Sequence, residues 1–206
     1  MANGLGKQAK TLTPNQLDAL LDYVQTETRF PERNRVIVLL SFKAGLRAKE
    51  IAGLTWGMVT DTEGRLMNAI SLQNVASKGK RGGRVLPIHQ MLKEALNSLY
   101  SVEKANGHAG ANDFVVRLAK GNNHVASRAA SVAFLFNKDW FKALRFRGAS
   151  SHSGRRTFIT SAARKVSEVG GSLRDVMALA GHSSIAITQR YVDADPEAQR
   201  KLIDRL

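Results

Sequence analysis

Residues 77–88 read SKGKRGGRVLPI, and this stretch decides the fold class. The segments over residues 66–77 and 83–88 are typical of strands, whereas KGKRGG between them is too polar and too rich in glycine to be anything but a loop. Most of the remaining chain follows helical periodicity. The predicted class is therefore α+β, mainly α, with a small antiparallel β-sheet or hairpin.

Helical patterns lie on both sides of this hairpin. Residues 13–16, TPNQ, combine an N-cap threonine, a proline at the first helical position and a glutamine at the capping-box position. The apolar positions that follow at helical spacing are Leu17, Leu20, Leu21 and Val24. Other helices are expected at about residues 34–43, 48–54, 90–104, 127–144, 152–166, 172–180 and 184–192. A short strand is expected at residues 114–116, and a last helix near the end of the chain.

The charge of the chain points to nucleic acid as a partner. The 206 residues are 43% hydrophobic, enough for a buried core, and the formal net charge is +14. Residues 117–165 contain eleven Lys or Arg and one acid, Asp139, together with six Phe or Trp. A disordered basic tail would lack those aromatic residues. The positive charge is therefore expected on a folded surface.

Several classes of protein are disfavoured by composition. The chain has no cysteine, which excludes disulfides and zinc fingers built on cysteine, and it has no apolar run of about 18 residues that could span a membrane. The first residues, MANGLGKQAK, lack the hydrophobic core of a signal peptide. Residues 1–11 are interpreted as a flexible basic arm, and the expected location is the cytoplasm of a bacterium, in a nucleoid-associated protein of bacterial or phage origin.

Six ionisable side chains stand where the predicted structure changes direction. Each alone has a plain explanation, because a lone arginine at a helix start is usually a surface residue and a lone histidine is usually structural. Together they form an ordered series along the chain. The series consists of Arg47, Lys78, His152, Arg155, His182 and Tyr191.

Four segments that contain these residues resemble the catalytic domain of the tyrosine recombinases, also called phage-type integrases. The segments are AGLRAKEIAGLTW (44–56), SKGKRGGRVLPI (77–88), SHSGRRTFITSAA (151–163) and LAGHSSIAITQRYV (179–192). They resemble, in order, the first arginine box, the lysine hairpin, the His-x-x-Arg box and the tyrosine box. Any one box can arise by chance, whereas four in the right order make a specific match.

The resemblance implies a role for each residue of the series. Arg47 and Arg155 would be the two arginines, and Lys78 the lysine of the hairpin. His152 would be the histidine of His-x-x-Arg, and His182 takes the place where family members carry His or Trp. Tyr191 would be the nucleophile. One position departs from the family, because residue 154 is glycine where leucine is more usual, and looser packing behind Arg155 is expected there.

The chemistry of DNA cleavage agrees with these residue types. Attack on a phosphodiester builds charge on its non-bridging oxygens, which two guanidinium groups can bind. A tyrosine has a pKa of about 10, so its phenol must lose a proton as it attacks, and a histidine can take or share that proton. The 5′-oxygen that departs needs a proton, which a lysine can deliver. Such a reaction requires neither metal nor another cofactor.

Some assignments stay open at the level of sequence. Lys80 is the alternative to Lys78 as the general acid. Glu50, one turn beyond Arg47, either orients that arginine or is a plain surface acid. The expected contacts to the DNA backbone are Lys80, Arg81, Arg84 and Arg156. The carboxylates form no plausible metal-binding cluster, and no Gly-rich phosphate loop of the Gly-Lys-Ser/Thr type is present.

A different class of function is the main alternative. Residues 172–192 could form a helix-turn-helix of a basic transcription factor, in which His182 and Tyr191 contact DNA. That interpretation leaves Arg47, Arg155 and the basic hairpin unexplained. A family member that binds DNA without catalysis is a third interpretation, which the presence of all six groups does not favour.

The resemblance also implies an organisation and partners. Residues 12–195 would form the catalytic domain, and residues 196–206 a C-terminal helix that docks on a neighbouring protomer or on its own chain. The partner would be double-stranded DNA with a specific recombination site, bound by a homo-tetramer, with accessory DNA-bending proteins as further partners. Most family members carry a core-binding domain before the catalytic one. Either the sequence is a fragment or it belongs with the short single-domain members.

Overall fold

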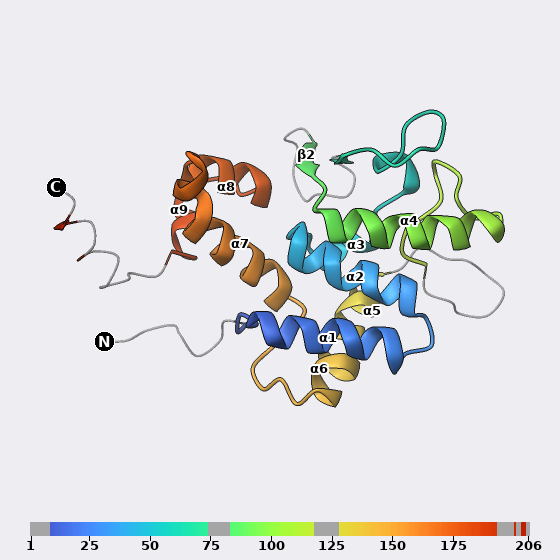
Figure 1. The fold of residues 1–206 in the computed structure, drawn as a ribbon, viewed down its shortest axis with the longest axis horizontal. Coiled ribbons are helices and arrows are strands. Elements are labelled where there is room, and N and C mark those ends of the chain that lie inside the picture. Colours follow the sequence, from blue (N-terminus) through green and yellow to red (C-terminus); the bar gives the residue numbers. More distant parts are fainter. Residues whose placement is uncertain (1–8, 74–82, 118–127, 193–199, 201–202, 205–206) are drawn as a thin grey trace. The chain divides into compact units, whose positions relative to one another are not determined.

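The computed structural model describes residues 9–73, 83–117, 128–192, 200 and 203–204. The chain divides into an N-terminal unit, Met1–Phe158, and a C-terminal unit, Ile159–Leu206, which are considered separately (Figure 1). Helices dominate both units, and the described strands form one two-stranded antiparallel sheet. The predicted fold class is therefore confirmed. Within the described ranges, no helix is long and apolar enough to cross a membrane.

The first helix, α1 (Pro14–Thr26), begins as its sequence predicts. Thr13 Oγ1 accepts the Gln16 N–H at 3.3 Å, and Gln16 Oε1 accepts the Thr13 N–H at 3.0 Å. This reciprocal pair satisfies two N–H groups that a helix start otherwise leaves without partners. The buried face of α1 contains Leu20, Leu21 and Val24.

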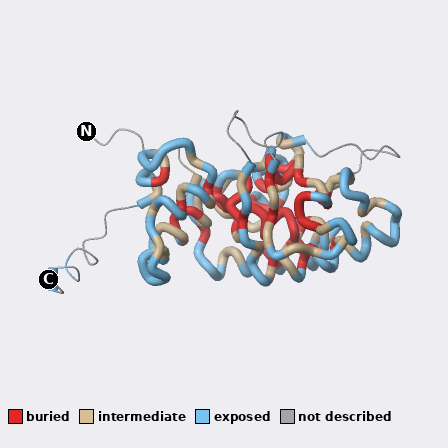
Figure 2. The backbone as a smooth tube through the Cα atoms, turned by 90° about the horizontal axis from the view of Figure 1, so that it is seen from above, coloured by how far each residue is buried: buried red, intermediate tan, exposed pale blue. Residues whose placement is uncertain are grey.

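The second helix, α2 (Pro31–Lys43), lies between α1 and α4 (Gln90–Ala105) (Figure 1). It begins three residues before the predicted start at residue 34. Pro31 explains the difference, because its fixed φ suits the first helical position and its missing N–H costs nothing there. Every residue from Val36 to Phe42 is buried, and Figure 2 shows such buried positions gathered in the interior of this unit. The helix α2 is therefore central to the core of the N-terminal unit.

The sheet pairs β1 (Ala69–Leu72) with β2 (Arg84–Pro87). Leu72 lies opposite Arg84, and Ala69 opposite Pro87. The side chains of Ile70 and Leu86 are buried, which fixes the register against the core. Both strands are shorter than predicted, and most of the basic loop lies outside the described residues. At the predicted third strand, only an isolated bridge between Thr55 and Phe114 forms.

The predicted helix over residues 127–144 contains an irregular turn. The described segment consists of α5 (Ala129–Phe134), the π-helix η3 (Leu135–Trp140) and α6 (Phe141–Ala143). Phe136, Trp140 and Phe141 are all buried, and their rings pack on one another with centroids 5.0 and 5.5 Å from the ring of Phe136. Residues four apart, such as Phe136 and Trp140, share a face of a regular helix, whereas Phe141 would turn away from Phe136. The wider π turn changes the helical phase, so all three aromatic side chains share the core.

The remaining helices contain or adjoin the described site residues of each unit. In the N-terminal unit, α3 (Ala48–Ala52) and the 3₁₀-helix η2 (Trp56–Met58) follow α2, and α7 (Ser153–Lys165) begins there and continues into the C-terminal unit. The C-terminal unit also contains η4 (Val166–Val169), α8 (Leu173–Ala180) and α9 (Ile185–Gln189). The helix predicted over residues 184–192 is thus shorter than expected. The predicted helix over residues 196–206 lies almost entirely outside the described residues.

Candidate active site

Arg47 follows the turn that joins α2 to α3. Gly45 has φ +64°, and a Cβ added there would come within 3.0 Å of the Phe158 ring. Leu46 is buried, and its N–H donates to the Leu40 carbonyl at 3.0 Å. Arg47 is therefore held at the start of α3 by a turn that only glycine fits, while 42% of its side chain stays exposed.

Arg155, in the first turn of α7, reaches this same turn. Its residue is 6% exposed, and its Nη1 donates to the Gly45 carbonyl at 2.6 Å across a separation of 110 residues. This bond holds the Arg155 guanidinium at Gly45, which is two residues before Arg47 in the sequence. The fold thus brings together the two arginines that the sequence analysis assigned to one phosphate.

The residues around Arg155 show how α7 is seated. A Cβ at Gly154 would clash with Ser41 Oγ and lie 2.8 Å from the Phe42 ring. The expectation of looser packing behind Arg155 is therefore wrong, because the glycine allows a close approach to α2. His152 is exposed immediately before α7, and its carbonyl accepts the Arg156 N–H at 2.9 Å. Arg156 is half-buried, and its contact to DNA stays a prediction.

Glu50 orients Arg47, which decides between the two interpretations of this acid. Its side chain is 1% exposed, Oε2 accepts the Arg47 N–H at 2.8 Å, and Oε1 accepts Arg47 Nη1 at 3.1 Å. Arg84 Nη1 and Nη2 donate to the same two oxygens at 2.8 and 3.0 Å. Burial by itself raises the pKa of Glu50, but the hydrogen bonds and charges of Arg84 and Arg47 outweigh it and hold the pKa below its ordinary value.

This lowered pKa predicts a stability difference that depends on pH. A carboxylate with a lowered folded pKa contributes stability above its ordinary value of 4.5 and loses it as pH falls through the folded value. Glu50→Gln should therefore unfold at a lower temperature than wild type at pH 7, since removing one partner of a buried pair costs about 3–5 kcal/mol. Thermal melts from pH 7 to pH 3 should show this gap closing in acid. A gap that stays constant or widens would rule out the ionised Glu50 pair as its source.

His182 and Tyr191 meet within the C-terminal unit. Gly181 ends α8 with φ +60°, and the His182 ring lies parallel to the Tyr191 ring, with centroids 5.6 Å apart and an angle of 22°. His182 Nδ1 is hydrogen-bonded to Thr188 Oγ1 at 2.9 Å, and Thr188 is fully buried. Tyr191 lies beyond the end of α9, and its N–H donates to the Thr188 carbonyl at 3.0 Å. Thr188 therefore holds both predicted site residues of this unit.

The remaining predicted site residues are the four basic residues of the hairpin, of which the structure describes one. Lys78, Lys80 and Arg81 lie outside the described residues, so their roles stay predictions. Arg84 is described, and two of its nitrogens are engaged by Glu50 with only 14% of the side chain exposed. Its predicted contact to DNA is untested by this geometry.

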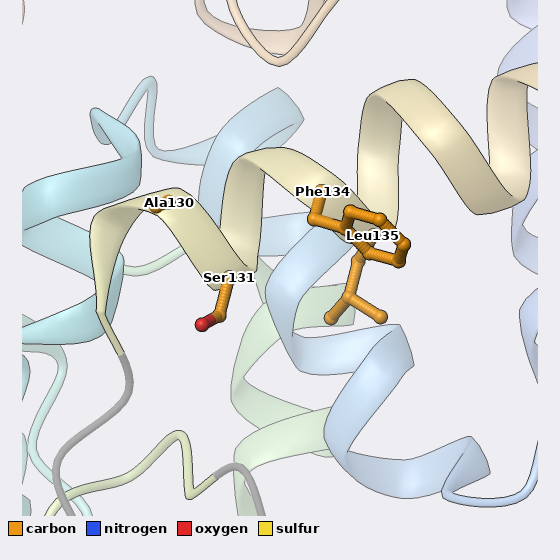
Figure 3. Close-up of a pocket in the computed structure, with 4 residues that line it drawn as sticks. All are labelled: Ala130, Ser131, Phe134 and Leu135. Carbon is orange, nitrogen blue, oxygen red and sulfur yellow. The ribbon is translucent and has the colours of Figure 1, made fainter.

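One shallow pocket lies on α5 and the start of η3. Its lining is Ala130, Ser131, Phe134 and Leu135, and Figure 3 shows the hydroxyl of Ser131 as its one polar side-chain group. This lining contains no ionisable group, so it offers no positive charge to a phosphodiester. Among the described residues, no group of three His, Cys, Asp or Glu could hold a metal ion.

Comparison with known proteins identifies the family. The sequence model of the phage integrase family matches residues 10–198. The tyrosine recombinase XerC of Xylella fastidiosa (strain 9a5c) is 30% identical over 196 residues, 93% of this chain and 60% of the relative. XerC of Pseudomonas aeruginosa (strain LESB58) is 26% identical over 210 residues, 99% of this chain and 63% of the relative. The chain belongs to the phage integrase family, as the four boxes predicted, and spans about three fifths of the length of these relatives.

Solved structures support the same fold. The crystal structure of XerA recombinase superposes with a TM-score of 0.70 at 22% identity, over 95% of this chain and 64% of that one. The catalytic domain of bacteriophage HP1 integrase superposes with a TM-score of 0.58 at 19% identity, over 96% of this chain and 95% of that one. The helix-turn-helix alternative accounts only for residues 172–192, whereas the family match extends over residues 10–198.

Two groups that position predicted site residues, one in each unit, were not predicted from the sequence. These are the Gly45 carbonyl, which binds Arg155, and the Thr188 hydroxyl, which binds His182. Neither group is ionisable, so neither stands out in the sequence as a candidate site residue. Each acts through a contact that forms only in the folded chain. Glu50 had a local signal, because it occupies the capping-box position three residues after Arg47.

Proposed function

We propose that this chain is the catalytic part of a site-specific DNA recombinase, which cleaves and rejoins DNA strands through a 3′-phosphotyrosine. The observation that supports this most directly is the bond from Arg155 to the Gly45 carbonyl. Residues from two separate boxes meet at one turn, which is what binding of a single phosphate by two guanidiniums requires. Family membership supports the same activity.

The proposed reaction assigns a step to each residue. Arg47 and Arg155 bind the non-bridging oxygens and stabilise the charge that develops there, where a single donor is worth about 2.7–4 kcal/mol in well-studied enzymes. The phenol of Tyr191 gives its proton to His152 as its oxygen bonds to phosphorus, the bond from phosphorus to the 5′-oxygen breaks, and Lys78 gives that oxygen a proton. His182 donates a hydrogen bond to the phosphate. The phosphotyrosine keeps the energy of the broken bond, so the 5′-hydroxyl of a partner strand can reverse the step.

The proposed partners extend beyond the single chain. They are double-stranded DNA with a specific recombination site, a homo-tetramer assembled on two duplexes, and accessory DNA-bending proteins, in a bacterial cytoplasm. The XerH recombinase bound to its difH substrate and the Tn1549 integrase bound to transposon end DNA have similar folds, at TM-scores of 0.68 and 0.70. Residues 12–195 are proposed as the catalytic domain and 196–206 as a docking helix.

A nicked duplex that carries the recombination site tests this function. Cleavage beside the nick releases a short fragment, so rejoining is prevented and the covalent intermediate accumulates. We expect a protein–DNA adduct that survives SDS, with DNA sequences beside the gene as candidate sites. Sequence-specific binding without any adduct would instead favour a DNA-binding protein without catalysis.

Lys78 gives a separate prediction about the leaving group. A substrate with sulfur in place of the bridging 5′-oxygen needs little protonation as it departs, because a thiolate is a far better leaving group. Lys78→Ala should therefore cleave normal DNA about 10²–10⁴-fold more slowly and recover on the sulfur substrate. Lys80→Ala serves as the matched control, with little loss on either substrate. If only Lys80→Ala is rescued, Lys80 is the general acid.

A further inference from the structure

Arg84 and Glu50 form a two-bond ion pair at the base of the hairpin. Arg84 is the first residue of β2, Glu50 is the third residue of α3, and 34 residues separate them. Each terminal nitrogen of the guanidinium meets one oxygen of the carboxylate, at 2.8 and 3.0 Å. The exposed fractions of the side chains are 14% for Arg84 and 1% for Glu50. This planar, two-point contact fixes the carboxylate in orientation as well as in position.

Glu50, held in this orientation, in turn fixes the position of Arg47. The same two oxygens accept the backbone N–H and Nη1 of Arg47, at 2.8 and 3.1 Å. Arg84, Glu50 and Arg47 therefore form a continuous series of hydrogen bonds, from a half-buried strand residue to an arginine whose side chain is 42% exposed. Because both carboxylate oxygens accept hydrogen bonds from Arg84, the Glu50 side chain can rotate only if it breaks those bonds.

The charges of these three hydrogen-bonded groups explain why Glu50 needs Arg84 in addition to Arg47. One carboxylate lies between two guanidiniums, so the three groups together carry a net charge of +1. Without Arg84, the buried carboxylate would either be neutralised by Arg47 or take up a proton and lose its hold on the Arg47 guanidinium. In both cases less positive charge would be held in place for an anion.

We infer that Arg84 is a positioning residue for Arg47, which neutralises and locks Glu50 so that Arg47 keeps its charge for the scissile phosphate. This inference rests on the proposed function, because it assigns Arg47 to that phosphate. It differs from the expectation that Arg84 itself contacts the DNA backbone. A direct contact and a positioning role give different results in two measurements.

The first measurement is the rate of a single cleavage turnover on the nicked duplex. Arg84→Leu should slow adduct formation about 10–100-fold, as loss of a supporting contact does in other sites, and Arg84→Lys should recover part of that loss. In an Arg47→Ala background, Arg84→Leu should cause no further loss, because the group it positions is already gone. Full additivity of the two losses would overturn the positioning role.

The second measurement is the salt dependence of DNA binding. A residue that neutralises one phosphate contributes about 0.9 to the slope of log K against log salt concentration. Arg84→Leu should leave this slope unchanged. A slope that falls by about one would show a direct phosphate contact and overturn the inference.

Two further variants separate positioning from folding. Arg117 forms a comparable pair with Glu103 at 2.9 Å, with side chains 12% and 18% exposed, so Arg117→Leu should lower the melting temperature without slowing cleavage per folded molecule. If Arg84→Leu alone does not fold, the double variant Glu50→Gln with Arg84→Met removes both charges of the pair and should fold, with cleavage slowed to a similar extent. Cleavage by that double variant at the wild-type rate would overturn the inference.

If wild type itself forms no adduct, the proposed function fails, and the positioning role fails with it.

Discussion

Tyr191→Phe should abolish the covalent protein–DNA adduct on the nicked duplex while DNA binding persists. The substitution removes only the phenolic oxygen, which is the atom that would form the bond to phosphorus, so no residual rate from this residue is possible. The Phe ring keeps the shape that stacks on His182, with centroids 5.6 Å apart in the wild type. The fold of the C-terminal unit should therefore be preserved.

Denaturing gels of wild type and variant on labelled DNA measure this effect, and binding at low salt shows that the variant still engages its site. The matched control is Tyr100→Phe, because the Tyr100 ring packs on Trp56 with centroids 4.9 Å apart and belongs to none of the four boxes. This control should form adduct at the wild-type rate. An adduct that survives Tyr191→Phe would refute Tyr191 as the nucleophile, whereas loss of the adduct in Tyr100→Phe would show that the effect is not specific to the Tyr191 oxygen.

Arg155→Ala should lower both the rate of adduct formation and the stability of the fold. The variant lacks a guanidinium for the phosphate, a change worth about 10²–10³-fold in rate where single charge-stabilising donors have been removed. It also leaves the Gly45 carbonyl without its bond from Nη1, and an unsatisfied buried polar group costs about 1–3 kcal/mol. Arg155→Lys should keep part of the rate, because the charge remains while the planar fork is lost.

The neighbouring arginine provides the control for this prediction. Arg156→Ala removes the same charge one position along α7, where the side chain is half-buried and assigned to the DNA backbone. It should reduce the salt slope of binding by about one and leave adduct formation unchanged at saturating DNA. Single-turnover rates and thermal melts of the two variants distinguish the roles. Equal rates for Arg155→Ala and wild type at saturation would contradict the assignment of Arg155 to the phosphate.

The sequence predicted most of the fold because its local signals are strong. Thr13 and Gln16 encode the start of α1, and the glycine-rich loop between two strand-like segments encodes the hairpin. The predictions failed where tertiary packing competes with local preference. The buried aromatic side chains of residues 135–141 are accommodated by a π-helix, and α9 ends at Gln189 rather than at residue 192.

The sequence by itself determined the family, and it predicted which side chains react. Transfer of a phosphodiester requires a nucleophile, cations and proton carriers, and these residue types stand in four boxes whose order along the chain makes the match specific. Each box is a local pattern, so the family could be predicted before any contact was known, and the match over residues 10–198 confirms it.

Only the tertiary structure decided what supports those groups. The bond from Arg155 to the Gly45 carbonyl spans 110 residues, and the pair between Arg84 and Glu50 spans 34. Whether Glu50 lies on the surface or beneath Arg47 depends on burial, which packing against distant residues sets. A carboxylate on the surface would contribute little, whereas the same carboxylate at 1% exposure between two guanidiniums holds Arg47 in place.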